Sequence, residues 1–144
     1  MIECRVLRST DDDFKHCSAI RMVVFVEEQQ VPPEEELDDL DAVAVHLLAL
    51  VDGEPVGTGR LIVEDGRTAR IGRMAVLRSH RGEGIGSAIL IRLMELARER
   101  GVGTVTLAGQ LHAIPFYEKH GFRAHGQVFL DAGIEHRSMD RQLA

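Results

Sequence analysis

A glycine-rich junction between an apolar segment and a long helical pattern constrains this chain more than any other feature. The junction reads RMAVLRSHRGEGIGSAILIRLMELARERG, residues 73–101, with glycines at alternate positions 82, 84 and 86. An apolar stripe at helical spacing follows these glycines. A strand that runs through glycines into a helix leaves the first helical amides free, and together with the helix dipole these amides attract an anion. The junction therefore predicts an anion site, with an unliganded tight turn as the structural alternative.

The distribution of charge favours one small polyanion over a nucleic acid. The 144 residues carry a formal net charge of −6, which makes general nucleic-acid binding a poor expectation. Residues 67–81 nevertheless hold five arginines and no acid, whereas residues 27–41 hold eight acids and no Lys or Arg. We interpret the arginines at 67, 70 and 73 as a solvated strand face. The acidic run from Glu34 to Asp41 is interpreted as a solvated loop, with attraction of a cationic substrate as the alternative.

Two common phosphate-binding motifs do not fit this junction. A P-loop requires Gly-Lys-Ser/Thr, which is absent. A dinucleotide-binding turn has the pattern G-x-G-x-x-G, but Ser87 occupies its third position, and no ribose-binding acid follows about 20 residues later. The anion site is therefore expected to belong to another class of protein.

Periodicity predicts alternating strands and helices in one domain spanning residues 1–144. Two Asp-Gly turns divide residues 42–77 into three strands, and the last of these has a spacing that favours a bulge. Thr10 is expected to cap the first helix. The other expected elements are a strand at 2–8, a helix after residue 10, the helix after the glycines, a strand at 102–109, a helix at 112–121 and two strands within 122–143.

Four motifs in the sequence resemble those of a known family. RGEGIG, residues 81–86, fits the R/Q-x-x-G-x-G/A signature of the GNAT superfamily of acyl-CoA N-acyltransferases. HAIPFYEKHGF, residues 112–122, is similar to the closing A-x-x-F/L-Y-x-x-x-G-F motif of that superfamily. VFVEEQQVPPEEELDDLD at 24–41 and FLDAGIEHRSM at 129–139 resemble its YjcF/ElaA-like branch. The resemblance covers nearly the whole chain.

This resemblance implies an α/β (α+β) fold and a cosubstrate. The fold is a GNAT-like mixed, mostly antiparallel sheet of six to seven strands, flanked by helices and splayed between strands four and five. Acetyl-CoA is expected to bind in the splay, with its pyrophosphate on the glycine turn and its pantetheine along strand four, and no metal is expected. The expected cofactor-binding residues are Met74, Ala75, Val76, Arg81, Gly82, Gly84, Ile85, Gly86, Ser87, Gln110 and Tyr117.

The implied reaction is direct attack of an amine on the thioester in a ternary complex. Tyr117, the only tyrosine in the chain, matches a family residue that acts as general acid or as hydrogen-bond donor to the thiolate; a core role is the alternative. Many members carry a glutamate base where this chain has Gly72. The catalytic candidates that remain are His46 and Glu28.

Other sources for the base are left open, namely Glu27, His136 and a water relay. His46 is the single polar residue in an apolar strand, so a structural, hydrogen-bonded histidine is an equal alternative to a catalytic one. The longer side chain of Gln110 stands where many members have asparagine.

We expect an acetyl-CoA-dependent N-acetyltransferase that acts on a primary amine, most simply a small molecule. A non-catalytic acyl-CoA-binding sensor is the alternative, and an acyl-homoserine-lactone-type synthase is a third hypothesis. The sequence has no apolar segment long enough to span a membrane and no apolar signal core at its N-terminus. A cytoplasmic protein with neither nucleic-acid nor membrane partners is therefore expected, and a homodimer is left open.

Overall fold

Short turns between consecutive strands build most of a single sheet, because antiparallel neighbours need only a few residues to connect them. The structure is a computed structural model that describes residues 1–143. Its seven strands are ordered β1-β2-β3-β4-β5-β7-β6, and only the β4–β5 pair is parallel. The strands are β1 (Ile2–Leu7), β2 (Val45–Val51), β3 (Glu54–Val63), β4 (Thr68–Val76), β5 (Thr104–Gln110), β6 (Arg123–Asp131) and β7 (Ile134–Gln142). The expected mixed, mostly antiparallel sheet is confirmed.

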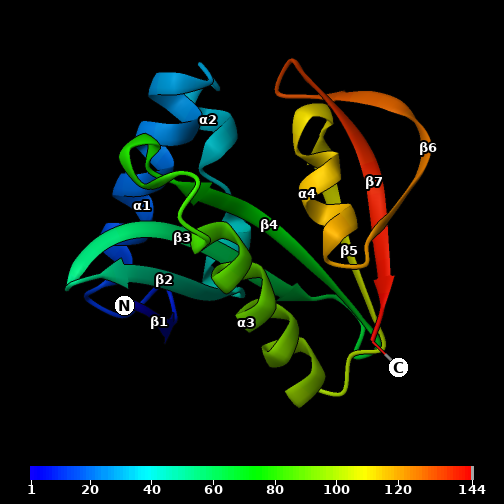
Figure 1. Cartoon of the computed structure of the whole chain (residues 1–144), viewed down its shortest axis with the longest axis horizontal. Helices are drawn as coiled ribbons and strands as arrows, with labels where there is room; N and C mark the ends of the chain where they lie inside the picture. Colours follow the sequence, from blue (N-terminus) through cyan, green and yellow to red (C-terminus); the bar gives the residue numbers. More distant parts are fainter. Residues whose placement is uncertain (144) are drawn as a thin grey trace.

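Helices occupy the expected places along the chain (Figure 1). They are α1 (Phe14–Arg21), which continues as the π-helical segment η1 (Met22–Glu28), α2 (Pro33–Glu36), α3 (Ile85–Glu99) and α4 (Ile114–Lys119). The expected cap at Thr10 is wrong: α1 begins later, after Asp13, because residues 9–13 form turns in which the Asp11 carboxylate accepts a hydrogen bond from the Arg8 amide. No helix within residues 1–143 is long and apolar enough to cross a membrane.

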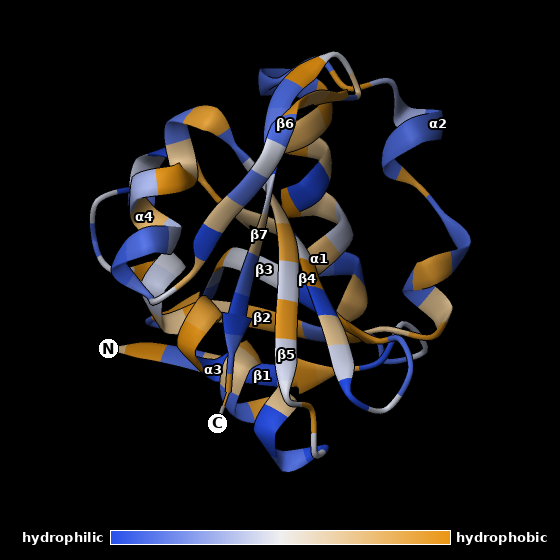
Figure 2. Ribbon diagram, turned by 90° about the vertical axis from the view of Figure 1, so that its right-hand side faces the viewer, coloured by the Kyte–Doolittle hydropathy of each residue, from blue (hydrophilic) through white to orange (hydrophobic). Residues whose placement is uncertain are grey.

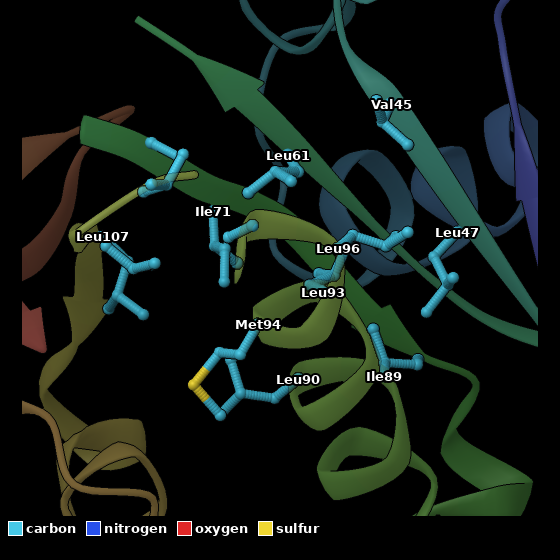
Figure 3. Packing of buried hydrophobic residues seen from close by; sticks show 14 of the residues in the cluster. Val45, Leu47, Leu61, Ile71, Ile89, Leu90, Leu93, Met94, Leu96 and Leu107 are labelled. Atoms are coloured by element: carbon cyan, nitrogen blue, oxygen red, sulfur yellow. The ribbon is translucent and has the colours of Figure 1, made fainter. Parts of the chain in front are cut away.

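The helices cover opposite faces of the sheet. Leu90, Leu93 and Met94 of α3 pack with Leu47, Leu61 and Ile71 of the sheet in the larger apolar core (Figure 3). Cys17, Ile20 and Val24 pack with Leu48, Leu50 and Ala75 on the other face, beneath α1 and η1. Burying one such side chain stabilises the fold by about 1.5–3 kcal/mol. The short acidic helix α2 lies at the margin of the molecule (Figure 2).

The sheet splits between β4 and β5, as expected. These two strands pair only through three residues each, 68–70 with 104–106. Beyond that point they separate, and Figure 1 shows them meeting near the C-terminus and diverging away from it. The sheet is therefore continuous at one end and open at the other.

The expected bulge in strand four is also present. The register between β3 and β4 shifts between the Thr58–Ala75 and Arg60–Gly72 pairs, so two residues of β4, Arg73 and Met74, lie opposite Gly59. Arg73 has a φ of 52°, which is uncommon for a residue other than glycine. Such an insertion exchanges the faces to which the side chains point. Ile71 accordingly packs in the core beneath α3, whereas Ala75 packs beneath α1.

Candidate active site

A cleft of about 610 Å³ opens where β4 and β5 separate. Both strands, η1, α4 and the turn between β6 and β7 contribute to its walls. Six of the residues predicted to bind the cosubstrate line it: Met74, Ala75, Val76, Arg81, Gln110 and Tyr117. Of the other five, Gly82 and Gly84 lie in the turn that leads from β4 into α3, and Ile85, Gly86 and Ser87 form the first turn of α3.

The open edge of β4 offers backbone groups to an extended ligand. Residues 71–76 pair with β3 on one side, but β4 has no partner on the β5 side after Arg70. Unpaired N–H and C=O groups along such an edge can bond an added strand or an extended chain of amides. The pantetheine of coenzyme A contains two amides, so its chemistry fits this edge.

The glycine turn presents free amides at the start of α3. Gly82 and Gly84 both have a φ of 83°, a conformation that side chains disfavour. The first backbone bond of the helix runs from the Ala88 amide to the Gly84 carbonyl, and in the described chain the amides of residues 85–87 have no backbone acceptor. Helix α3 has 15 residues, so its dipole adds positive potential at these amides. The turn therefore fits a phosphate or pyrophosphate.

Arg81 is held in place beside this turn by two contacts. Its Nε donates to the Val76 carbonyl at 2.9 Å, and its Nη2 donates to Glu28 Oε2 at 2.8 Å. The Arg78 guanidinium lies 3.7 Å from the same Glu28 oxygen. The structure therefore places Glu28, a predicted catalytic residue, against the arginines of the turn and outside the residues that line the cleft. We assign it no proton transfer.

A Ser–His contact at the glycine turn was not anticipated from the sequence. Ser87 Oγ lies 3.0 Å from Nε2 of His120, the residue that follows α4. Burial, followed by the nearby charges of Arg141 and Lys119, lowers the pKa of His120. The contact therefore ties α4 to the start of α3 and orients the Ser87 hydroxyl. The glycine signature and the tyrosine motif identified Ser87 and Tyr117, but neither motif specifies a histidine at position 120.

Tyr117 projects from α4 into the cleft, toward the open edge of β4. Its hydroxyl has one weak partner, Met74 Sδ at 4.0 Å. The ring packs edge-on against Phe116 and Phe122. Burial raises the pKa of the Tyr117 hydroxyl to about 12, so this group remains protonated throughout the neutral range. A protonated hydroxyl without a strong partner is available to donate a hydrogen bond to a ligand.

Gln110 reaches across the cleft to a residue that sequence reasoning missed. Its Nε2 donates to Gln29 Oε1 at 3.0 Å, which connects the end of β5 to the end of η1. Gln29 also lines the cleft. The sequence signal for Gln29 was its place within the motif at 24–41, but nothing in the sequence indicated a π-helical segment ending beside β5, a type of helix that is frequent at functional sites.

His46 does not reach the cleft, which corrects the expectation that it acts as a base. The side chain is 1% exposed and is not among the residues that line the cleft. Its Nε2 lies 3.0 Å from the Asp41 carbonyl, and its ring packs edge-on against Phe14. Burial lowers its pKa. His46 therefore fits the structural role that the sequence left open for it, that of a buried and hydrogen-bonded histidine.

A different histidine, His136, does line the cleft. It lies on β7 directly opposite Gln110 of β5, so the two side chains share one face of the sheet. Its Nδ1 lies 2.7 Å from the Ile134 carbonyl, and its ring stacks on Phe129. A neutral imidazole that donates from Nδ1 keeps Nε2 as a proton acceptor. His136 is thus one of two imidazoles that the fold brings to the cleft, the other being that of the exposed His112.

Part of the acidic run and Arg73 belong to a partly buried charged cluster, which corrects the interpretation of these residues as solvated, whereas Arg67, Arg70, Glu34, Glu35 and Asp39 are exposed as expected. We call it the arginine–acid cluster. Arg21 binds Glu36 and forms a two-pronged pair with Asp41, and Arg60 forms a similar pair with Asp38. Hydrogen bonds from Arg60 lower the pKa of Asp38. The members are Arg21, Arg60, Arg73, Glu36, Asp38 and Asp41.

The arrangement as a whole fits the acyl-transfer site that the family resemblance implies. A split sheet, free amides at a helix start and a cleft tyrosine occur together here. The family model for the acetyltransferase (GNAT) family matches residues 11–122. This chain belongs to that family of acyltransferases.

Individual relatives agree with this assignment. The protein YjcF of Bacillus subtilis, named as an uncharacterized N-acetyltransferase, is 39% identical over 135 residues, covering 93% of this chain and 96% of that protein. The structure of Escherichia coli ElaA is 28% identical, with a TM-score of 0.87 over 98% of this chain and 99% of that one. An acyl-CoA N-acyltransferase from Pseudomonas aeruginosa is 29% identical, with a TM-score of 0.86 over 98% and 99%. The resemblance to the YjcF/ElaA-like branch is confirmed.

Proposed function

We propose that this protein is an N-acetyltransferase that moves the acetyl group of acetyl-CoA to a primary amine of a small molecule. The observation that carries the proposal is the position of Tyr117, whose protonated hydroxyl faces the unpaired edge of β4 within the cleft. Coenzyme A would lie with its pyrophosphate on the amides of residues 82–87 and its pantetheine along residues 74–76. Gln110 provides a further amide for the pantetheine or for the acceptor.

Direct attack suits a cleft that is open to both substrates. The amine nitrogen forms a bond with the carbonyl carbon of the thioester, the carbon–sulfur bond breaks, and the sulfur leaves with the electron pair as thiolate. A backbone N–H of β4 beyond the bulge would donate to the carbonyl oxygen as it becomes negative, which is the kind of contact that lowers such barriers most. The attached nitrogen, which is positively charged after attack, releases a proton to water as the carbon–sulfur bond breaks, so the amide product is neutral and is released.

Tyr117 acts on the sulfur as a hydrogen-bond donor. Its pKa of about 12 lies well above that of an ordinary thiol, about 8.5, so complete transfer of its proton to the thiolate is unfavourable. A donor that keeps its proton still stabilises the negative charge that develops as the bond breaks. The leaving thiolate then takes its proton from solvent.

The proton of the attacking ammonium requires a separate acceptor. An alkylammonium has a pKa of about 10.4, so little free amine exists at pH 7. His136 offers a proton-accepting Nε2 in the cleft, and we propose it as the base, directly or through water. His136→Gln should lower kcat. An unchanged kcat in this variant would assign the role to solvent.

Two measurements test the function. Acetyl-CoA should raise the melting temperature, because a ligand that binds only the folded state stabilises it. A panel of primary amines should then release free thiol from acetyl-CoA, with the acetylated amine identified by mass spectrometry. Cofactor binding without turnover for any amine would favour a sensor of acyl-CoA, and the absence of cofactor binding would refute the proposal.

A further inference from the structure

The wall of the cleft that faces α1 and α2 is polar, and Arg73 is central to it. Arg60, Arg70 and Arg73 line this wall. Arg70 is exposed and pairs with Glu64 at 2.8 Å, and Arg60 is paired with Asp38 and Asp41. Arg73 differs from these two arginines. Its guanidinium is largely enclosed, but some of its N–H groups have no hydrogen-bond acceptor.

The bulge in β4 is what directs Arg73 to this wall. Ile71 faces α3, so regular alternation would also direct residue 73 toward the apolar core beneath that helix. The extra residue opposite Gly59 reverses the alternation, and Arg73 instead contacts Glu36 and Asp38 on the other face. The left-handed conformation of Arg73, with φ of 52°, is part of this local geometry. Strained backbone of this kind is concentrated at binding and catalytic sites.

Arg73 uses only one of its three nitrogens for hydrogen bonds. Its Nη2 donates to the carbonyls of Glu35 and Glu36 and to Asp38 Oδ2. Its Nε is buried without a hydrogen-bond partner, since Glu36 Oε1 lies 3.5 Å away in poor geometry. Its Nη1 has no hydrogen-bond acceptor in the described chain. Unlike Nε, this nitrogen is not one of the buried atoms that lack a partner. The guanidinium is therefore anchored through one nitrogen and keeps donors at the other two.

The acids nearby do not offset this surplus of donors. The cluster contains three arginines and three acids, so its formal charges balance. Two guanidinium Nε atoms, those of Arg60 and Arg73, are the buried side-chain polar atoms without a partner within residues 1–143. Both Nε atoms are enclosed, so Nη1 of Arg73 is the donor without an acceptor that an arriving anion can reach.

Space for such a group exists beside Arg73. Gly72 lines the cleft, and a Cβ placed on it would meet no atom within 4 Å. Its φ is not in the left-handed region, so neither conformation nor packing requires glycine at this position. The absent side chain leaves the wall hollow next to the guanidinium.

We propose that the acceptor amine carries an anionic group, a carboxylate or a phosphate, and that this group binds the guanidinium of Arg73. The inference rests on the proposed function and specifies its acceptor. Arginine binds both anions through paired, charge-assisted hydrogen bonds. Anchoring the acceptor at this end holds its amine in the cleft, which lowers the entropic cost of attack. Arg73 is a specificity-determining residue in this arrangement.

A purely cationic acceptor is the competing possibility, and the structure disfavours it. Three acids of the run that suggested it, Glu36, Asp38 and Asp41, are already paired with arginines. Of the acids that line the cleft, Glu36 is bound to Arg21, whereas Glu35 and Asp131 are exposed to solvent. Exposed carboxylates attract a cation weakly, because water screens them. A second cation would also meet the unsatisfied donors of Arg73.

Matched ligand pairs test the inference. Amino acids of increasing length are compared with their amides, glucosamine 6-phosphate with glucosamine, and simple diamines serve as the cationic class. Binding to the protein, with and without coenzyme A, is measured by calorimetry, and turnover is measured by thiol release. At least one anionic amine should bind about 10- to 100-fold more tightly than its neutral counterpart. The carboxylate and phosphate series separate the two anions.

Variants then assign the preference to Arg73. Arg73→Gln should abolish the preference for anionic amines. Arg73→Lys keeps the charge but not the paired donors, so it should retain part of this preference. Arg67→Gln is the control, because Arg67 is exposed and does not line the cleft. Circular dichroism and the acetyl-CoA-induced shift in melting temperature show that each variant is folded. If Arg73→Gln does not fold, Arg73→Lys tests the assignment instead, because its preference for anionic amines should be weaker than that of the wild type.

Three outcomes would overturn the inference. These are anionic amines that bind no better than their neutral partners, diamines that bind best, and a preference that persists in Arg73→Gln. Acetylation of neutral amines at full rate would refute the anionic acceptor while leaving the acetyltransferase intact. Loss of acetyl-CoA binding in the wild type would instead refute the proposed function. The two failures are therefore distinguishable.

Discussion

The two sides of the cleft are built from different parts of the chain. On the side of the glycine turn, the groups that we propose to bind the cosubstrate are backbone amides of residues 82–87 and the free edge of β4. On the side of α1 and α2, the groups that we propose to act on the acceptor are side chains, chiefly Arg73, Gln29 and His136, brought together from distant segments. Backbone groups suit a ligand shared by many enzymes, because any sequence that makes the turn supplies them. Side chains suit a ligand that differs from one enzyme to the next.

The largest expected effect comes from filling the glycine turn. Gly84→Glu should abolish the rise in melting temperature caused by acetyl-CoA, because the new carboxylate blocks the amides and repels phosphate. Gly66→Glu is a matched control: Gly66 has a φ of 84°, close to the 83° of Gly84, and both positions have open space around a Cβ. Both variants therefore carry the same backbone strain, but only Gly66→Glu should keep the shift. Equal binding by the two variants would remove the turn from the site.

Tyr117 is expected to matter for turnover and not for binding. Tyr117→Phe should lower kcat about 100- to 1000-fold, the usual cost of losing one donor to a developing anion. Affinity for acetyl-CoA should change little, and so should stability, since the hydroxyl has only the 4.0 Å contact to Met74 Sδ. With a pKa of about 12, the group should produce no titration between pH 6 and pH 10 in the wild type. A normal kcat in the phenylalanine variant contradicts the assigned role.

The arginine–acid cluster should act as one structural unit. Arg21 is 2% exposed, and Arg21→Met removes the nearest partner of Glu36 and one of the two arginine partners of Asp41, which should lower the free energy of unfolding by about 3–5 kcal/mol. Arg92→Met breaks two surface ion pairs and should cost about 0–1 kcal/mol. Urea unfolding measures both variants. A loss in Arg21→Met no greater than in Arg92→Met would show that the cluster is not a structural unit.

The smallest effect concerns the link between the two sides. Gln29 and Gln110 bond at 3.0 Å across the cleft, and a hydrogen bond of this kind contributes about 0.5–1.5 kcal/mol. Single alanine variants and the double variant should therefore show a coupling of that size in kcat/KM for the acceptor. Additive effects would mean that the contact is absent during turnover.

Sequence reasoning predicted the fold and the backbone half of the site because both follow from local rules. The Asp-Gly turns, the glycine junction and the tyrosine motif each concern a few adjacent residues. The spacing within β4 even indicated the bulge at Arg73. The resemblance to the family supplied the splay, which periodicity alone does not reveal.

The side-chain half of the site could not be predicted in the same way. His46 and His136 are both isolated histidines in strand-like segments, and only the sheet order shows that β7, and not β2, borders the cleft. The acidic run looked solvated because its arginine partners lie 15 to 38 residues from it in sequence. Pairings over such separations depend on the packing of α1 and α2, which is a property of the folded chain.

The short junction between β4 and β5 also determines how their amides exchange with deuterium. Because pairing ends at Arg70, the β4 amides that point toward β5 beyond this residue have no protein acceptor, whereas those that point toward β3 do. Exchange along residues 71–76 should therefore divide into slow and fast amides in the free protein, with regular alternation interrupted at the bulge of Arg73 and Met74. A pantetheine bound along this edge would slow the fast class and leave the slow class unchanged. The strand itself would then act as a residue-level sensor of cosubstrate occupancy, readable by NMR without any label on the ligand.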